Sequence, residues 1–571
     1  MLLSTRRFVS SSASGSAATR AIFCDGPILA AMQSQGIASA NDSKAFVDQP
    51  LRSSAAAVLR SWHEGCGRAG APPPSRASLA AFLAEHFDPA GSDLVNVRPA
   101  DWHADASFLK RISNASVREF AKHVHGLWPA LGRRTSSSVS AQPDRHTLTA
   151  LPNAFIVPGG RFRESYYWDS LWIVKGLLIS GMCETAEGMV RNLLHQVAVH
   201  GYVPNGNRIY YEGRSQPPVL SEMVRAVAAA LNETRARAFT AAALPLLEVE
   251  LEWWRRERSV EGLGLSFYSA ATTVPRPESW REDAALCGAA AERGASNASI
   301  ATLMRSVAAA AESGWDFSSR WLDAPAREPP HVPTSSVELL LRLNTSAVLA
   351  VDLNAILLRA ELNVRRMHSE LGNVSAASVF EAKAKTRWTA MESALWCDAR
   401  GAWRDAGRVA TTWQPLPPIA SASDFLPLWA VREAGDAAIV GLNPSRASRA
   451  VETLAASPLR GRGGVGATVL RTGQQWDWPN GWAPLQLMLV EALREGDPRV
   501  LGSAAAPLGA SIAQRWLASN IASFPRDATG MYEKFDVETV GQRGGGGEYA
   551  PQIGFGWTNG VALSLVGMAR R

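Results

Sequence analysis

The chain has 571 residues, of which 46% are hydrophobic and 19% are charged. This composition is typical of a globular protein with a large core, and it excludes disorder of the main body. The net charge of +6 is small for this length, and no run of five or six Lys or Arg indicates a nucleic-acid or lipid surface. No apolar run approaches the roughly 18 residues of a membrane span. We therefore expect a neutral ligand, no nucleic-acid partner and no transmembrane segment.

The N-terminus carries conflicting signals of location. Residues 1–21 contain Arg6, Arg7 and Arg20, many Ser and Ala, and no acid. This is the composition of an organellar presequence, so we interpret the segment as a targeting leader or a disordered N-terminus. N-x-Ser/Thr sequons fit a secretory route instead, and they begin at Asn41, Asn114, Asn232, Asn297, Asn344 and Asn373. The compartment stays open.

The rest of the chain is mostly helical by pattern. Apolar residues return every three or four positions in segments rich in Ala, Leu, Arg and Glu. This spacing predicts helices at 79–86, 169–200, 219–231, 235–256, 284–312, 337–371, 376–396, 445–456, 483–494 and 504–517. Long loops with Gly, Pro, Trp and Asp separate the helices, as at 201–218, 268–283 and 541–559, and such loops usually carry function. An all-α chain of this kind is compatible with an (α/α)6 toroid or with a superhelical repeat array, although no repeat period is visible.

The cysteines and histidines indicate neither a disulfide framework nor a metal site. The five cysteines lack CxxC spacing, and their odd number leaves at least one thiol unpaired. They are Cys24, Cys66, Cys183, Cys287 and Cys397. Histidines such as His195 and His200 lack the carboxylate neighbours typical of a zinc site. We expect no metal and no cofactor.

Two polar, aromatic-rich stretches lie far apart in the sequence. Residues 158–169 read PGGRFRESYYWD, and residues 474–482 read QQWDWPNGW. Aromatic faces, carboxylates and a guanidinium suit a neutral, hydroxyl-covered ring. The two stretches resemble the signature motifs of the trehalases of glycoside hydrolase family 37, and they match the patterns PGGRFxExYxWD and QWDxPxxW at every fixed position. Residues 22–44 are also similar to the family, so the resemblance covers about residues 22–562.

The resemblance implies both a fold and an activity. The fold is an (α/α)6 barrel formed by residues 22–571 as a single domain, with catalytic loops at one end. The activity is that of an α,α-trehalase, which hydrolyses trehalose to two glucose molecules with inversion, and it predicts selectivity against maltose and starch. A catalytically silent sugar-binding or regulatory protein, and a hydrolase of a related glucoside, remain alternatives. The sequence is silent on oligomeric state, and we take a monomer as the expectation.

Two carboxylates are the candidates for chemistry, because breaking a glycosidic bond requires an acid and a base or nucleophile. Asp316 follows Trp315 and precedes Phe317, and aromatic neighbours favour a raised pKa. By resemblance, Asp316 is the expected general acid and Glu533 the general base. Phe535 stands where the family usually has Tyr, which predicts one hydroxyl fewer near the base. An inverting enzyme holds its two carboxyl groups roughly 6.5–9.5 Å apart.

Three arginines are candidates for sugar binding, because a planar guanidinium holds several hydroxyls at once. Arg161, Arg214 and Arg276 each match a substrate-binding position of the family. By the same resemblance, the remaining pocket residues are expected to be Phe162, Trp168, Asp169, Asn205, Ser215, Gln216, Glu278, Gly314 and Glu548.

The glycine run 544–547 lies between Glu533 and the C-terminal segment. It lacks the spacing of a phosphate-binding loop. We interpret it as a lid over the sugar, with a disordered linker as the alternative. The tryptophans of the loops, such as Trp315, Trp321 and Trp476, are expected to offer flat faces to sugar C–H groups.

Overall fold

The computed structural model describes residues 16–68, 72–328, 331–333, 335–409, 412–524 and 530–568. Residues 1–15, which make up most of the expected leader, lie outside the described residues. Helix α1 (Ala17–Phe23) begins within the leader range. No helix of the described part is long and apolar enough to cross a membrane.

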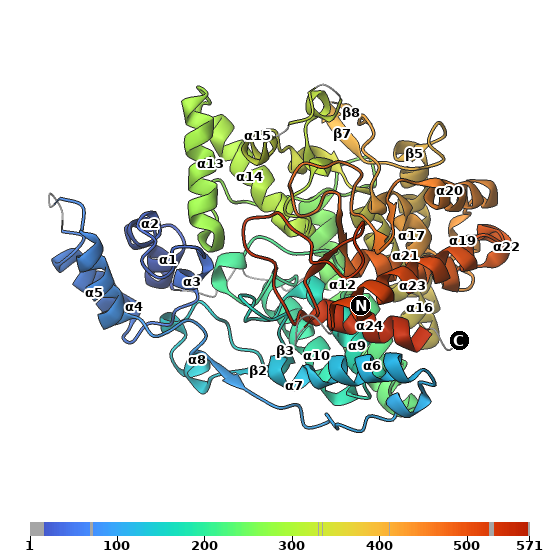
Figure 1. The fold of residues 1–571 in the computed structure, drawn as a ribbon, viewed down its shortest axis with the longest axis horizontal. Helices are drawn as coiled ribbons and strands as arrows, with labels where there is room; N and C mark the ends of the chain where they lie inside the picture. Colours follow the sequence, from blue (N-terminus) through green and yellow to red (C-terminus); the bar gives the residue numbers. More distant parts are fainter. Residues whose placement is uncertain are drawn as a thin grey trace, which may run out of the picture.

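Six of the described helices form a closed ring. Each packs against the next, and the last packs back against the first. In ring order these inner helices are α9 (Tyr167–Ile179), α11 (Leu220–Ala228), α16 (Val351–Glu370), α18 (Leu426–Ala430), α21 (Ala483–Glu495) and α24 (Gly556–Met568). Four of them, α9, α16, α21 and α24, are labelled in Figure 1.

An outer layer of helices surrounds this ring. One outer helix precedes each inner helix along the chain, and the outer helices pack on the inner ones or, for α20, on the turn just before α18. They are α6 (Ala115–Gly126), α10 (Cys183–His200), α12 (Glu233–Arg258), α17 (Val374–Ala394), α20 (Pro444–Ala456) and α23 (Ala505–Ser523). The alternation of two layers is an (α/α)6 toroid, so the predicted all-α fold class is confirmed.

The other helices and the strands lie outside the two layers of the toroid. The remaining α-helices are α1, α2 (Pro27–Ser34), α3 (Lys44–Val47), α4 (Ala55–Glu64), α5 (Arg76–His86), α7 (Trp128–Leu131), α8 (Ser137–Ala141), α13 (Trp280–Glu292), α14 (Asn297–Ser313), α15 (Ser336–Leu341), α19 (Asp436–Val440) and α22 (Pro498–Leu501). The strands pair antiparallel in small sheets. They are β1 (Leu94–Asn96), β2 (Gly132–Thr135) and β3 (Phe155–Ile156); β4 (Val348–Leu349), β7 (Ala406–Val409) and β8 (Thr412–Pro415); β5 (Trp396–Cys397) with β6 (Ala402–Trp403); β9 (Arg460–Gly461) with β10 (Gly464–Val465); and β11 (Asn480–Trp482) with β12 (Lys534–Asp536).

Helices α1 to α5 form an N-terminal lobe on one side of the ring, at the left of Figure 1. The lobe has a small hydrophobic core of its own, which includes Tyr166, Tyr210 and Tyr211 from the toroid. A buried ion pair of 2.7 Å joins Lys44 of α3 to Glu164 of the first signature. The lobe is therefore fixed to the segment that leads into α9.

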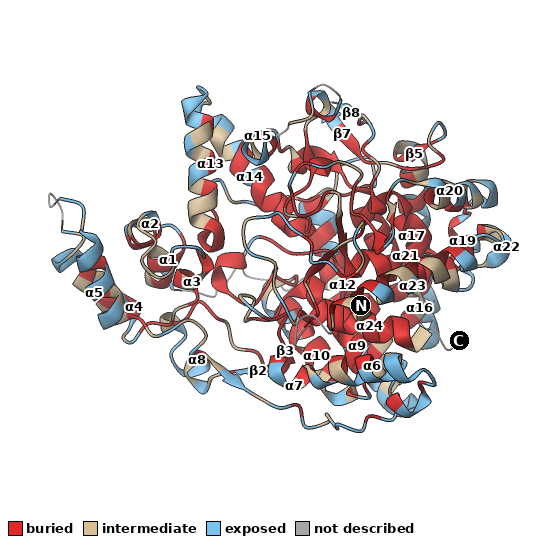
Figure 2. Ribbon diagram, viewed as in Figure 1, coloured by how far each residue is buried: buried red, intermediate tan, exposed pale blue. Residues whose placement is uncertain are grey.

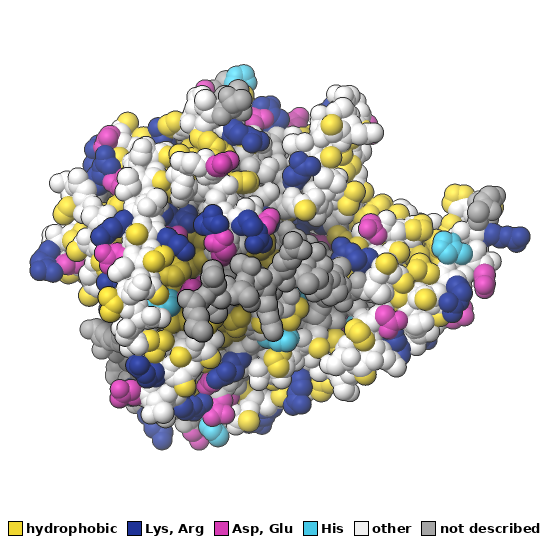
Figure 3. Space-filling model, turned by 180° about the vertical axis from the view of Figure 1, so that it is seen from behind, with side chains coloured by type: hydrophobic (Ala, Val, Ile, Leu, Met, Phe, Trp, Pro, Cys, Tyr) yellow, Lys and Arg dark blue, Asp and Glu magenta, His cyan; other side chains and the backbone are white. Residues whose placement is uncertain are grey.

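Burial is deepest in the ring, whereas the outer helices and the lobe present exposed residues (Figure 2). On the face seen in Figure 3, Lys and Arg side chains are interspersed with Asp and Glu, so the described side chains there form no continuous field of one sign.

The structure breaks three predicted helices and begins another helix inside a predicted loop. The runs 169–200, 284–312 and 337–371 each split into two helices, and Gly181 (φ +78°) and Gly294 (φ +80°) lie at the first two breaks. Left-handed glycine ends a helix without strain. Helix α24 begins inside the predicted loop 541–559. Its Gly560 is required by packing, because a Cβ there would lie 2.0 Å from the carbonyl oxygen of Trp172 in α9.

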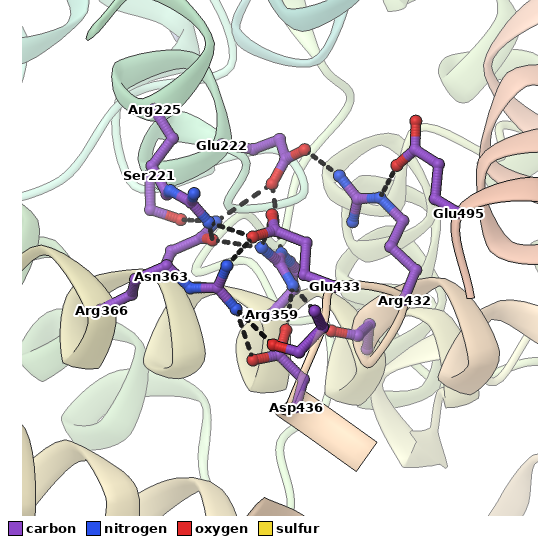
Figure 4. A network of polar contacts seen from close by, with 12 residues as sticks. Ser221, Glu222, Arg225, Arg359, Asn363, Arg366, Arg432, Glu433, Asp436 and Glu495 are labelled. Atoms are coloured by element: carbon purple, nitrogen blue, oxygen red, sulfur yellow. Dashed lines mark hydrogen bonds and ion pairs between the residues drawn. The ribbon is translucent and has the colours of Figure 1, made fainter. Parts of the chain in front are cut away.

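A network of largely buried ion pairs joins the inner helices (Figure 4). Arg359 of α16 lies within it, 3.3 Å from Glu222 of α11 and 2.6 Å from Asp436 of α19. Burial raises the pKa of Glu222, but Arg432, Arg359 and Lys175 together lower it well below its usual range. The network therefore ties α9, α11, α16 and α21 to the segment after α18 through Lys175, Glu222, Arg225, Arg359, Arg366, Arg432, Glu433, Asp436, Glu491 and Glu495.

Candidate active site

The two signatures meet at one cavity of about 90 Å³, at the end of the ring where α9, α21 and α24 begin. The cavity brings together most of the residues predicted from the sequence. Those that line it are Asp316, Glu533, Arg161, Phe162, Trp168, Asp169, Asn205, Arg214, Gln216, Arg276, Glu278, Gly314 and Glu548.

Ser215 is the one predicted site residue that does not line the cavity. Its hydroxyl donates to the carbonyl of Val203 at 2.6 Å, and its N–H donates to Glu312 at 2.9 Å. These contacts hold the loop that presents Arg214 and Gln216 on either side of it. In this structure Ser215 fixes the loop without lining the cavity.

Asp316 stands on a loop that leaves the C-terminus of α14. Gly314, at φ +75°, makes the turn into this loop, a conformation that glycine adopts without strain. Burial raises the pKa of the Asp316 carboxyl to about 6, although the charges of Arg276 and Arg214 oppose the shift. A carboxyl of this kind keeps its proton in weakly acidic solution, as a general acid must.

Glu533 lies just before β12, and its carboxylate has two donors. The hydroxyl of Tyr549 donates to Oε1 at 2.7 Å, and the N–H of Gln552 donates to Oε2 at 3.2 Å. Its backbone carbonyl also accepts from the indole N–H of Trp557 at 2.9 Å. The carboxylate is therefore held in one orientation.

Phe535, where a tyrosine is usual by resemblance, places no hydroxyl beside Glu533. Its ring is fully buried against Trp516 and Tyr532. The hydroxyl beside Glu533 comes from Tyr549, which follows the glycine run. Tyr549 was not predicted as a site residue, although it directly follows Glu548, which was predicted to line the pocket.

Each of the three arginines is paired with a carboxylate. Arg161 donates to Asp42 of the N-terminal lobe at 2.7 Å, and its guanidinium lies 4.6 Å from the centre of the Tyr549 ring. Arg214 donates to Glu278 at 2.7 Å and to Asn205 at 2.9 Å. The fixed guanidinium planes suit hydroxyl groups rather than a further anion.

Arg276 is held most firmly. Asp283 accepts from its Nε at 2.8 Å and from its Nη2 at 2.7 Å. The same Nη2 donates to Glu548 at 3.1 Å, and the hydroxyl of Ser279 donates to Glu548 at 3.4 Å. Arg276 therefore joins the segment after the glycine run to the wall of the cavity.

Two further carboxyls in the cavity have raised pKa values. Burial and then the neighbouring charge of Glu533 raise the pKa of Asp169 well above its usual range. Burial raises the pKa of Glu548 to about 7 against the opposing charge of Arg276. Carboxyls that crowd one cavity disfavour an anionic ligand, because each additional negative charge would be repelled.

Three buried polar atoms of the cavity wall have no hydrogen-bond partner among the described residues. They are Nε1 of Trp168, Nε1 of Trp476 and Oε2 of Glu278. Buried polar groups without a partner are rare in proteins. A polyhydroxylated ligand has both the acceptors and the donors that these atoms would require as partners.

The tryptophans are arranged differently from the expectation. Trp476 is stacked between Trp315, at 5.0 Å, and Trp482, at 4.0 Å, so its two faces are covered by protein. Trp315 and Trp321 are fully buried, and neither lines the cavity. Trp476 and Trp482 do line it, but the two faces of Trp476 are covered by other tryptophans.

The cavity wall also contains residues that the sequence analysis did not single out. They are Lys44, Tyr166, Tyr211, Ser279, Ala311, Gln475, Tyr549, Phe555 and Trp557. Lys44 belongs to the N-terminal lobe, so only the folded chain could place it here. No cluster of three or more His, Cys, Asp or Glu in the described part of the chain could hold a metal ion.

The comparisons with known proteins agree with one another. A family model described as Trehalase matches residues 38–569. A probable trehalase of Oryza sativa subsp. japonica is 39% identical over 552 residues, which cover 92% of this chain and 91% of that protein. The trehalase of Homo sapiens is 37% identical over 554 residues, covering 95% and 88%.

A solved structure shares the fold. The neutral trehalase of Saccharomyces cerevisiae superposes with a TM-score of 0.57 over 72% of this chain and 73% of that chain, at 24% identity. The family match extends over nearly the whole chain and includes both segments that meet at the cavity. This chain belongs to the trehalase family.

Proposed function

We propose that the protein hydrolyses α,α-trehalose to two glucose molecules with inversion at the attacked carbon. The observation that carries this proposal is a pair of carboxyls in one cavity with different surroundings. Burial raises the pKa of Asp316 to about 6, whereas the carboxylate of Glu533 accepts hydrogen bonds on both oxygens. Such a pair suits one group that gives a proton and one that takes a proton.

In the proposed reaction, Asp316 donates its proton to the glycosidic oxygen as the bond from that oxygen to C1 breaks. The second glucose then leaves as a neutral alcohol. Glu533 accepts a proton from a water molecule, whose oxygen bonds to C1 from the opposite face. One trehalose and one water become two glucose molecules, and proton exchange with solvent restores both carboxyls.

Sugar recognition in this proposal uses the paired arginines and the polar atoms that lack partners. Arg161, Arg214 and Arg276 are oriented by their carboxylates, so little side-chain entropy is lost when they bind hydroxyls. The free N–H groups of Trp168 and Trp476 donate to sugar oxygens, and Glu278 accepts from a sugar hydroxyl.

The glycine run serves as a lid in this account. The cavity of about 90 Å³ is smaller than the roughly 300–1,000 Å³ of ordinary ligand pockets, so the wall must open to admit a disaccharide. Arg276 and Ser279 hold Glu548 through their side chains, and Asn480 and Lys534 bind the carbonyls of Gly545 and Gly546. Closure would exclude bulk water from the reacting carbon.

Gly546→Ala is expected to reduce both stability and kcat/KM, whereas Gly545→Ala is expected to change neither. Gly546 has φ +74°, and a Cβ there would lie 2.2 Å from the carbonyl oxygen of Gly473. The left-handed conformation alone costs other residues about 1–2 kcal/mol. A Cβ on Gly545 meets no heavy atom within 4 Å. Thermal unfolding and trehalose kinetics of both variants check this, and equal behaviour of the two would contradict a closely packed lid.

The activity on trehalose is expected to fall as the pH rises through about 6. A general acid works only while it holds its proton, and burial raises the pKa of Asp316 to about 6. The raised pKa keeps the proton in place below this pH and releases it above, so kcat/KM should fall about tenfold per pH unit on the alkaline side. Initial rates of glucose release across the pH range check this. A profile that stays flat well into alkaline solution would argue against Asp316 as the acid.

The direct test of the proposed activity is glucose release by the purified chain from trehalose, with maltose as the matched control. Both sugars contain two glucose units, and they differ in which atoms the linkage joins. Turnover of trehalose alone supports the proposal. Turnover of another α-glucoside in preference to trehalose would replace it with a related glucosidase. Binding of trehalose without turnover by the folded protein would indicate a silent sugar-binding protein.

A further inference from the structure

The second signature, residues 474–482, contains a buried acid that the proposed chemistry does not use. Asp477 is fully buried and does not line the cavity. We propose that this signature sets the position of the acid relative to the base, and that Asp477 is a positioning residue for the loop that carries Asp316. The proposal rests on the proposed roles of Asp316 and Glu533.

Asp477 binds the loop that carries Asp316, here called the acid loop (residues 314–319), through several hydrogen bonds. Its Oδ1 accepts from the hydroxyl of Ser318 at 2.9 Å and from the hydroxyl of Ser319 at 2.8 Å. The backbone N–H of Ser319 donates to Oδ2 at 2.9 Å and to Oδ1 at 3.1 Å. Ser318 and Ser319 follow Asp316 by two and three residues, so Asp477 fixes the chain directly after the acid.

The remaining donors to Asp477 lie shortly before it in the sequence and not on the loop that carries Asp316. The hydroxyl of Thr468 donates to Oδ1 at 2.8 Å, and the hydroxyl of Thr472 donates to Oδ2. No Lys, Arg or His of the described residues forms an ion pair with this carboxylate. Asp477 is thus an ionisable group held only by neutral donors, some on the loop that carries Asp316 and some outside it.

Two neighbours of Asp477 bind the same loop. The N–H of Trp476 donates to the carbonyl of Phe317 at 3.1 Å. The side-chain amide of Gln475 donates to the carbonyl of Asp316 itself. Three consecutive residues of the signature therefore contact the acid and the residues that follow it.

The other end of the signature is joined to the base. Strand β11 pairs antiparallel with β12, so that Trp482 lies opposite Lys534, the residue after Glu533. The ammonium of Lys534 also donates to the side-chain oxygen of Gln475 at 2.7 Å. Gln475 thus links the acid to the strand of the base through one side chain.

The signature is consequently a rigid spacer between the two catalytic groups. An inverting enzyme needs a fixed gap for the attacking water, and a displacement of about 1 Å can cost roughly 10²-fold in rate. This role explains why the stretch contains an acid, an amide and stacked tryptophans that cannot all contact a sugar.

The test compares two substrates that differ in their need for an acid. Trehalose requires protonation of its leaving oxygen, whereas α-D-glucopyranosyl fluoride loses fluoride without it. For Asp477→Asn we expect kcat on trehalose to fall by about 10²-fold, the fluoride to be hydrolysed within about tenfold of the wild-type rate, and KM for trehalose to change little. Equal losses on both substrates, or a loss confined to KM, would overturn the positioning role.

The matched control is Asp424→Asn. Asp424 is also buried and accepts from a serine, with Ser421 N–H and hydroxyl both at 3.2 Å, but it lies on the turn before α18. It should change stability without changing the ratio of the two substrate activities. A shifted ratio in Asp424→Asn would show that the ratio reports stability alone.

A second set of variants covers the case in which Asp477→Asn does not fold or the fluoride is not turned over. Ser318→Ala and Ser319→Ala together remove hydroxyl donors on the acid loop, whereas Thr468→Val removes one outside it. The serine pair, and not Thr468→Val, should move the alkaline limb of the trehalose pH profile, because the surroundings of the acid change. An unmoved limb in the serine pair refutes the proposal. Failure of the wild type to hydrolyse trehalose would instead refute the proposed function.

Discussion

Asp316→Asn and Glu533→Gln are each expected to lower kcat on trehalose by roughly 10²–10⁴-fold, the usual contribution of a positioned acid or base. Both substitutions keep the size of the side chain and remove the ability to exchange a proton. Because both residues line the cavity and the substitutions keep its shape, trehalose binding should persist in each variant. Calorimetric titration with trehalose and initial rates of glucose release measure the two properties separately.

Glu250→Gln is the matched control for these variants. Burial also raises the pKa of Glu250, to about 7, but the carboxyl accepts from the hydroxyl of Tyr167 at 2.6 Å and does not line the cavity. Its activity should remain within a few fold of wild type. If Asp316→Asn or Glu533→Gln retains most of its activity, that residue is not the acid or the base.

Arg359→Met is expected to destabilise the fold by about 3–5 kcal/mol, the cost of removing one partner from a buried ion pair. Arg359 is almost fully buried and contacts Glu222, Asp436 and Glu433. Without it, the carboxylate of Glu222 on α11 and those of Glu433 and Asp436 after α18 would face one another with less positive charge between them. Thermal and denaturant unfolding measure the loss.

Arg342→Met is the control for the ion network. Arg342 contacts Asp323 at 2.7 Å on the surface, and its side chain is 42% exposed. Exposed pairs contribute about 0–1 kcal/mol, so this variant should unfold close to the wild type. Similar small effects of both substitutions would mean that the buried network does not stabilise the ring.

Much of the fold could be predicted because local signals specify the long helices. The predicted helices 235–256, 376–396 and 483–494 lie within or nearly within α12, α17 and α21. Periodicity could not show that the ring closes, because closure depends on α24 packing against α9. Gly176 of α9 and Gly560 of α24 allow this close approach. In the sequence, glycines of this kind favour a loop. The predicted loop 541–559 therefore includes the start of α24.

The candidate site could be predicted as a set of residues but not as an arrangement. Resemblance to a family supplied Asp316, Glu533 and the arginines, and the fold gathers all but Ser215 around one cavity. The partners of these residues were beyond reach, because they come from distant segments. Asp42 lies 119 positions from Arg161, and Asp477 lies 159 positions from Ser318. Only the folded chain shows that the second signature forms hydrogen bonds with the loop that carries Asp316.

The measurement that tests the central claim most directly is proton NMR of the glucose released from trehalose at early times, before the anomers interconvert. Inversion with Asp316 as acid and Glu533 as base predicts equal amounts of α- and β-glucose, because the attacked ring inverts and the leaving ring keeps its configuration. Release of α-glucose alone would indicate retention through a covalent intermediate, and it would contradict the role of Glu533 as a base that activates water.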